Sequence, residues 1–190
     1  MKIFDTSLEG VVLLEPELFG DARGYFMESY SQERFDRQVR PVRFVQDNES
    51  RSAYGVVRVL HFQRAPYAQS KLVRVISGRV LDVAVDLRRG SPTFGRHVAV
   101  ELSGDNRRQL FIPRGFAHGF AVLSPVAVFQ YKCDSPYAPQ CEGGIAWDDP
   151  ELGIDWQLAP GEIILSEKDA RNPRLAEAGA LFDFNTDYYA

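Results

Sequence analysis

Several features that identify common classes of protein are missing from this sequence. It contains two cysteines, Cys133 and Cys141, and their spacing fits no zinc or redox motif. No apolar run approaches the roughly 18 to 20 residues needed to span a membrane, and the N-terminus lacks the long apolar core of a signal peptide. The formal net charge of −4 disfavours a nucleic-acid-binding protein, although it leaves room for a local basic pocket that binds a small anion. We therefore expect a cytoplasmic protein with reduced thiols that acts on neither nucleic acid nor membrane.

Short apolar segments separated by Gly, Pro, Asn and Asp dominate the middle of the chain, as expected for strands joined by turns. Seven or more such segments at near-regular spacing indicate a β-sandwich or barrel rather than alternating strands and helices. Short helices are expected from Ser31 to about Val39 and from Ser166, which Asp169 follows three residues later. The expected strands are 11–15, 44–48, 56–63, 71–77, 79–86, 97–102, 108–112, 116–122 and 126–133.

The length of 190 residues favours one domain, because we find no internal repeat, low-complexity segment or linker. A composition of 45% hydrophobic and 25% charged residues argues against disorder, and 12% aromatic residues are typical of β structure. We expect a single domain over 1–190, with an N-terminal arm at 1–50, a β-barrel core at about 51–135 and a C-terminal tail at about 136–190.

The histidines are few enough to consider one by one, since the chain has three. His61 lies in an apolar strand together with Arg58 and Gln63, and Lys71 follows ten residues later in the next strand. Burying such polar groups without partners is costly, so either a ligand uses them or water reaches them. Taken alone, His61 is equally well interpreted as a hydrogen-bonded structural histidine on a hydrated strand face and as a catalytic base.

A second histidine follows a turn between two apolar strands. The segment PRGFAH places Pro113, Gly115 and His118 in a strand–turn–strand unit about 50 residues after His61, whereas His97 opens a strand and is expected at the surface. Together the His61 and His118 segments resemble the two motifs of the cupin superfamily. That resemblance implies a mainly β fold, a cupin-type jelly-roll barrel (double-stranded β-helix) whose mouth holds a small ligand.

Metal-binding cupins have His-x-His in the first motif and a glutamate a few residues later. In this chain Gln63 occupies the place of the second histidine, and Tyr67 or Ala68 that of the glutamate. His61 and His118 alone offer too few ligands for a tight transition-metal site, so we expect no metal.

Histidine, lysine, tyrosine and aspartate can carry out proton transfer without a metal. A histidine can abstract a proton next to a carbonyl, a lysine can stabilise the resulting enolate, and a tyrosine can return the proton from the other face. An aspartate can hold the histidine in one tautomer. Tyr131, on a late strand, and Asp169, in the tail, are the candidates. From spacing alone, a core tyrosine and a helix-capping aspartate remain the simpler interpretations.

Ordered segments along nearly the whole chain resemble the dTDP-4-dehydrorhamnose 3,5-epimerase family, including RVLHFQ at 58–63 and PRGFAHGF at 113–120. The resemblance implies a cofactor-independent isomerase that converts dTDP-4-dehydro-6-deoxy-D-glucose to dTDP-4-dehydro-L-rhamnose, acts as a homodimer and needs no metal. The matching segments are 19–28, 44–48, 58–63, 71–75, 82–88, 91–95, 113–120, 131–132 and 147–150.

The resemblance also implies roles for individual residues. His61 would be the base, paired with Asp169; Lys71 would stabilise the enolate oxygen, and Tyr131 would supply a proton from the opposite face. The substrate-binding residues that the resemblance implies are Arg23, Phe26, Glu28, Gln46, Asn48, Arg58, Lys71, His118, Tyr137 and Lys168. Among them, Arg23, Phe26 and Glu28 form a segment that crosses to the partner subunit in this family, and Tyr137 would stack on the thymine.

The sequence differs from the family pattern at Val59, where the family usually has glycine. A valine there narrows the pocket beside His61, shifts Arg58, or has no effect because it faces away. Three alternative functions stay open: an epimerase acting at only C3 or C5 of another dTDP-4-keto-sugar, a metal-dependent cupin dioxygenase, and a module that binds sugar nucleotides without catalysis.

Overall fold

A computed structural model describes residues 1–179 and 181–190 of the chain. Within these residues the structure is mostly β, with one short α-helix, α1 (Gln32–Gln38), and four single-turn 3-10 helices. The 3-10 helices are η1 (Pro139–Cys141), η2 (Pro160–Glu162), η3 (Asp169–Arg171) and η4 (Leu175–Glu177). The strands are β1 (Lys2–Asp5), β2 (Val12–Glu15), β3 (Phe19–Asp21), β4 (Gly24–Phe26), β5 (Gln46–Ala53), β6 (Val57–Gln63), β7 (Lys71–Ser77), β8 (Arg79–Asp86), β9 (Arg88–Arg89), β10 (His97–Ser103), β11 (Gln109–Ile112), β12 (Phe116–Val122), β13 (Val126–Cys133), β14 (Glu142–Gly144) and β15 (Phe182–Asp183).

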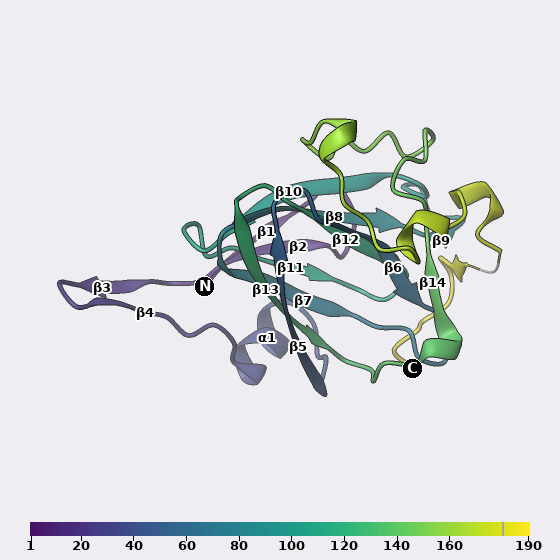
Figure 1. The fold of residues 1–190 in the computed structure, drawn as a ribbon. Coiled ribbons are helices and arrows are strands. Elements are labelled where there is room, and N and C mark those ends of the chain that lie inside the picture. The colour runs from purple at the N-terminus through teal and green to yellow at the C-terminus, as the bar shows by residue number, and fades with distance from the viewer. Residues whose placement is uncertain (180) are drawn as a thin grey trace.

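Two antiparallel sheets form the body of the protein (Figure 1). One has the strand order β1-β2-β11-β7-β13-β5, and the other has the order β10-β8-β12-β6-β14. From β10 to β13 the chain alternates between the sheets, so that strands close in sequence lie in opposite layers. This arrangement confirms the predicted cupin-type jelly roll, and it places β6 opposite β7 and β13.

Three apolar clusters hold the layers together. The central one lies between the sheets and includes Val75, Phe120 and Phe129. A second covers the outer face of the five-stranded sheet, where β6, β8 and β12 pack against Trp156 and Phe182 of the C-terminal tail. Because it is covered on both sides, every residue of β12 is buried. The third cluster packs Phe35 of α1 against Leu14, Leu72 and Phe111 of the six-stranded sheet.

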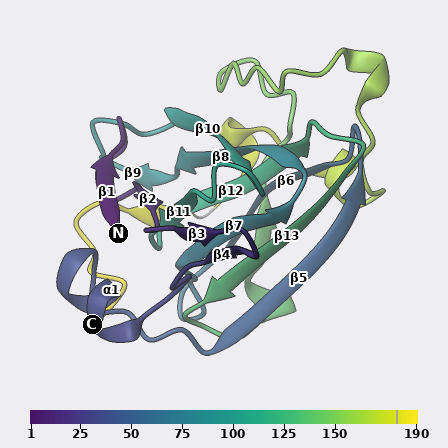
Figure 2. The same cartoon turned by 90° about the vertical axis from the view of Figure 1, so that its left-hand side faces the viewer.

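The N-terminal arm contains a hairpin of β3 and β4 that extends away from the body in Figure 1 and points toward the viewer in Figure 2. Its turn lies between Asp21 and Gly24, as the glycines and aspartate of this segment predict. The aromatic side chains of Phe19, Tyr25 and Phe26 are all largely exposed on this hairpin. Exposed aromatic side chains on a projecting element are typical of a contact with another molecule.

Most of the expected elements are confirmed, and two are not. The bounds predicted for β7, β8, β12 and β13 agree with the structure, and the Ser31 side chain caps α1 as expected. The strand expected at 44–48 is instead β5, which begins later and runs to Ala53 because it pairs along the whole of β13. Phe44 stays outside the sheet and packs edge-on against Phe35. The helix expected from Ser166 forms only the single turn η3, because Pro173 follows it closely.

The structure contains no helix that is long and apolar enough to cross a membrane, as far as the described residues go.

Candidate active site

A β-bulge in β6 determines which side chains point between the sheets. In a regular strand Arg58 and His61, three residues apart, would face opposite sides. Here two residues of β6, Val59 and Leu60, lie opposite the single residue Gly119 of β12, so the alternation slips by one. Arg58 and His61 therefore face the same side.

The bulge also explains Val59, at the position where the resemblance departs. Val59 and Leu60 are both fully buried in the apolar cluster beneath the C-terminal tail, and neither lines the pocket described below. Leu60 adopts a φ of 35°, and a methyl group added to Gly119 would lie 2.7 Å from the carbonyl oxygen of Arg58. The close approach of the two strands thus requires glycine at 119, while the valine at 59 faces away from the site.

His61 forms a hydrogen-bonded pair with Asp169, with 2.6 Å between Nε2 and Oδ1. The Asp169 side chain is buried, whereas 31% of the His61 side chain is exposed. Burial opposes ionisation of Asp169, but hydrogen bonds from His61, Ser166 and the Val59 backbone N–H outweigh it and lower the pKa of the carboxyl. Asp169 is therefore ionised at neutral pH, and it orients the His61 ring through Nε2.

The opposite wall of the pocket comes from the six-stranded sheet. The ammonium nitrogen of Lys71 lies 5.8 Å from the centre of the Tyr131 ring. Burial raises the pKa of Tyr131, so its hydroxyl keeps its proton near neutral pH. Arg58 reaches across from β6, and its Nε donates a hydrogen bond of 3.3 Å to the Ser52 hydroxyl. The full lining of the pocket is Gln46, Asn48, His61, Phe62, Gln63, Gln69, Lys71, Tyr131, Cys133, Tyr137 and Glu142.

Glu142 stands at the mouth of the pocket and was not anticipated from the sequence. The hydroxyl of Tyr137 donates to it at 2.7 Å, and Lys168 forms an ion pair with the same oxygen. Burial disfavours its charge, but these two partners prevail and lower the pKa of Glu142. Glu142 thus links Tyr137 and Lys168, two of the expected ligand residues. On its other side, the backbone N–H of Tyr137 donates a hydrogen bond to the side chain of Gln46. An isolated glutamate followed by two glycines gave no signal of this role.

His118 lies behind the pocket lining rather than in it. Its ring is stacked on Phe129 with 6.0 Å between centroids, and only 7% of the side chain is exposed. Its Nε2 is 2.9 Å from a carboxylate oxygen of Asp82, which is fully buried. Burial lowers the pKa of His118, so this histidine is neutral near pH 7.

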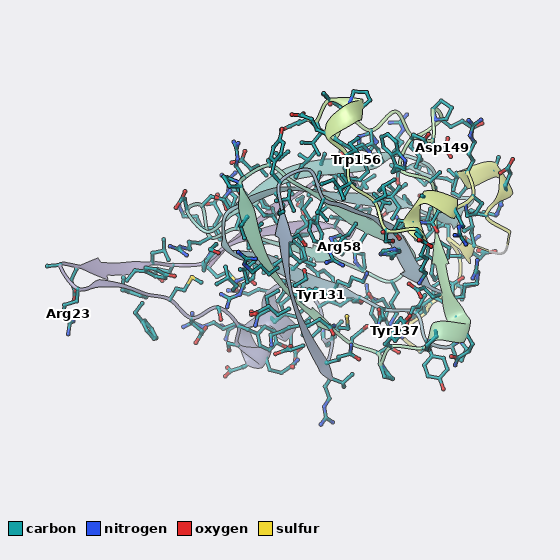
Figure 3. All side chains as sticks on the ribbon, in the orientation of Figure 1. Arg23, Arg58, Tyr131, Tyr137, Asp149 and Trp156 are labelled. Atoms are coloured by element: carbon teal, nitrogen blue, oxygen red, sulfur yellow. The ribbon has the colours of Figure 1, made fainter. Side chains whose placement is uncertain are left out.

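Three expected ligand residues lie away from the pocket within one chain. Figure 3 shows Arg23 at the tip of the projecting hairpin, far from Arg58 and Tyr131 in the barrel. Arg23 pairs with Asp21, and Phe26 and Glu28 line a separate hollow at the base of the hairpin. The described residues that line that hollow include no histidine or lysine, so it has no counterpart of His61 or Lys71.

Within the part of the chain that the structure describes, no group of three or more His, Cys, Asp or Glu side chains is placed so that it could hold a metal ion.

Comparisons with known proteins agree on one family. The sequence profile described as dTDP-4-dehydrorhamnose 3,5-epimerase matches residues 5–177. The chain is 54% identical over 172 residues to the dTDP-4-dehydrorhamnose 3,5-epimerase of Escherichia coli (strain K12). The aligned region covers 90% of this chain and 92% of the Escherichia coli chain. It is 40% identical over 179 residues to the dTDP-4-dehydrorhamnose 3-epimerase of Streptomyces niveus, with 94% and 86% covered. Among solved structures, dTDP-6-deoxy-D-glucose-3,5-epimerase from Legionella pneumophila Philadelphia 1, in complex with dTDP-4-keto-L-rhamnose, superposes with a TM-score of 0.94 at 47% identity, covering 97% of this chain and 99% of that one.

Proposed function

Because this chain belongs to the dTDP-4-dehydrorhamnose 3,5-epimerase family, we propose that it is an isomerase that converts dTDP-4-dehydro-6-deoxy-D-glucose to dTDP-4-dehydro-L-rhamnose. The reaction inverts C3 and C5 on either side of the C4 ketone. The ketone acidifies the hydrogens on both carbons, so one set of acid and base groups can serve both positions.

The observation that carries this proposal is the placement of the proton-transfer groups on opposite walls of one pocket. His61 projects from β6 in the five-stranded sheet, while Lys71 and Tyr131 project from β7 and β13 in the six-stranded sheet. A sugar ring held between the sheets has a base on one face and an acid on the other. That is the arrangement that inversion of a carbon centre needs.

The chemistry proceeds by proton removal and return. His61, oriented by Asp169, takes the proton from the carbon next to the ketone, and the electron pair moves onto the C4 oxygen. The Lys71 ammonium stabilises the resulting enolate. Tyr131 then gives its hydroxyl proton to the opposite face of the carbon, and solvent restores the protonation of both residues.

Arginine and lysine at the mouth suit the diphosphate of a nucleotide sugar. Arg58 is exposed on the pocket side of β6, and Lys168 is held at the rim through Glu142. We propose that the diphosphate binds to these two cations, with Tyr137 against the base and with Gln46, Asn48 and His118 supporting the sugar end.

Solvent exchange tests the function directly. With dTDP-4-dehydro-6-deoxy-D-glucose in D₂O, NMR should show deuterium at both C3 and C5 and the product with both centres inverted. Label at C3 alone would support the second candidate, a single-site epimerase, which the similarity to the Streptomyces niveus 3-epimerase keeps in view. Binding of the sugar nucleotide without any exchange would overturn catalysis altogether.

The exposed hairpin supports a homodimer. Phe19, Tyr25 and Phe26 expose apolar rings on β3 and β4, and the expected ligand residues Arg23 and Glu28 lie beside them. We propose that this hairpin docks on a second copy and brings these residues to its pocket. Light scattering of the purified protein should give twice the 21.5 kDa chain mass, and a monomer at micromolar concentration would contradict the proposal.

A further inference from the structure

Gln63 is a buried polar residue in the wall of the pocket, and it takes no part in the proton transfer or in the substrate contacts proposed above. It ends β6 two residues after His61, at the place where metal-binding cupins have a second histidine. Only 4% of its surface is exposed. A buried amide is destabilising unless hydrogen bonds satisfy it, so the partners of Gln63 indicate what it does.

The Gln63 amide makes three hydrogen bonds, all to backbone groups of two neighbouring loops. Its oxygen accepts from the Ala138 N–H at 2.7 Å, and its nitrogen donates to the carbonyl oxygens of Tyr67 at 2.8 Å and of Pro136 at 3.1 Å. The orientation of the amide is fixed, because an N–H can only donate and a carbonyl oxygen can only accept. The oxygen and the nitrogen of the amide are thus both used within the protein.

Two of these bonds flank Tyr137. The Pro136 carbonyl belongs to the peptide unit before Tyr137 and the Ala138 N–H to the peptide unit after it, so Gln63 holds the chain on both sides of this residue. The N–H of Tyr137 itself donates to the Gln46 side chain at 3.1 Å. The segment between β13 and η1 is irregular, and these side-chain bonds satisfy backbone groups that a strand ladder would otherwise satisfy.

The ring of Tyr137 is the group that this arrangement positions. Tyr137 lines the pocket and is 54% exposed, although two glutamines hold its backbone and its hydroxyl donates to Glu142 at 2.7 Å. An aromatic ring that is fixed at both ends loses little conformational freedom when a flat ligand ring packs on it, which favours binding. On a loop without these bonds the ligand would have to order the ring, at a cost in affinity.

We propose that Gln63 is a positioning residue that holds the Tyr137 ring at the mouth of the pocket for the base of the nucleotide, a role that rests on the proposed function, in which Tyr137 lies against that base. Gln63 acts through the backbone of the loop and not on the reacting carbons. Its loss should therefore weaken nucleotide binding and spare proton transfer.

Gln63→Met keeps the length of the side chain and removes all three hydrogen bonds. The dissociation constant of dTDP, measured by calorimetry, should rise by about tenfold, within the range that loss of one aromatic contact with a base produces. With saturating keto-sugar, kcat should stay within about twofold of the unmodified protein, because a residue that acts on binding alone changes KM. A lower kcat with an unchanged KM would place Gln63 in proton transfer and overturn the proposal.

A double-mutant cycle shows whether Gln63 acts through Tyr137. Tyr137→Ala removes the ring that Gln63 would position, so adding Gln63→Met to Tyr137→Ala should change the dTDP dissociation constant by less than about twofold. The same rise with and without the Tyr137 ring would mean that Gln63 supports the pocket in general, and the assignment would be wrong.

Asn106→Leu is the matched control. The Asn106 side chain also makes three hydrogen bonds to backbone groups, those of Glu101, Ser103 and Arg108, but it lies in the turn between β10 and β11 and is not among the described residues that line the pocket. This variant should lose stability and bind dTDP as the unmodified protein does. Equal weakening of dTDP binding by Gln63→Met and Asn106→Leu would mean that loosening any turn disturbs the pocket, and it would overturn the proposal.

Amide hydrogen exchange of Ala138, followed by NMR, gives a readout that needs no ligand. The Ala138 N–H loses its acceptor in Gln63→Met, so its exchange should become about tenfold faster or more, and it should stay unchanged in Asn106→Leu. Unchanged exchange of Ala138 in Gln63→Met would overturn the proposal, even if the protein had no epimerase activity. If the unmodified protein did not bind dTDP, the proposed function would fail, and the Ala138 exchange would still decide whether Gln63 holds this loop.

Gln63→Glu serves if Gln63→Met does not fold. The glutamate keeps the oxygen that accepts from Ala138 and loses the bonds donated to Tyr67 and Pro136. The cycle with Tyr137→Ala then decides in the same way: a weakening of dTDP binding that needs the Tyr137 ring supports the proposal, and one that does not need it overturns the proposal.

Discussion

Replacing His61 by asparagine should lower kcat for deuterium exchange at C3 and C5 by about 10² to 10⁴-fold, the usual contribution of a positioned general base. Asparagine is chosen because its amide can still donate to Asp169, so the buried carboxylate keeps a partner. The pocket should therefore keep its shape. Exchange is followed by NMR with the dTDP-keto-sugar in D₂O, and dTDP affinity is measured by calorimetry.

His97→Asn provides the control for this variant. His97 opens β10, at the edge of the five-stranded sheet, and does not line the pocket. Its replacement should leave exchange and dTDP affinity unchanged. If His61→Asn exchanged deuterium at the unmodified rate, another group would have to be the base. A parallel loss of dTDP binding would instead indicate that His61 supports the pocket and is not its base.

The local patterns of the sequence predict the strands well but not the face to which His61 points. Runs such as 71–77 and 116–122 are apolar, of strand length and bounded by turn residues, so their limits follow from residues close in sequence. The bulge in β6, in contrast, cannot be predicted from residues close in sequence. It depends on Gly119, 58 residues after His61, which lets the two strands approach closely. Strict alternation would place Arg58 and His61 on opposite faces, and only the pairing of β6 with β12 corrects this.

The His61–Asp169 pair illustrates a second limit. The two residues are 108 positions apart, and Asp169 is also hydrogen-bonded to Ser166, as a helix-capping residue would be. The Asp169 backbone N–H thus makes the bond expected of a helix-capping segment, and its side chain makes the bond to His61 that a catalytic pair would need. Residue spacing alone cannot separate these two interpretations, whereas the resemblance to a family pairs Asp169 with His61.

Acidic residues in apolar surroundings are the hardest to place from the sequence. Asp82 interrupts the run from Val80 to Val85, and a single polar residue in a buried strand gives no direction for its side chain. Glu142 follows the short η1 turn, where no periodicity exists to place it. Both become meaningful only through neighbours from other strands: His118 for Asp82, and Lys168 for Glu142.

Replacing Tyr131 by phenylalanine should separate proton exchange from inversion. His61 still removes the proton and can return one to the same face, so deuterium from solvent should continue to enter the substrate without a change of configuration. Inversion needs a donor on the opposite wall, and in this variant the ring remains while the hydroxyl is lost. We expect the rate of inversion to fall by about 10² or more, the contribution typical of a positioned acid.

The ratio of exchange to inversion is the decisive quantity, because a general loss of structure would lower both rates together. Tyr54→Phe is a suitable control, since Tyr54 is exposed and follows β5 at the end remote from the pocket, where Ala53 pairs with Val126. It should leave the ratio unchanged. Inversion at the unmodified rate in Tyr131→Phe would show that another group or a water molecule protonates the second face. Equal loss of exchange and inversion in a variant that keeps its dTDP affinity would place Tyr131 in proton removal instead, and the two walls of the pocket would then have to exchange their proposed roles.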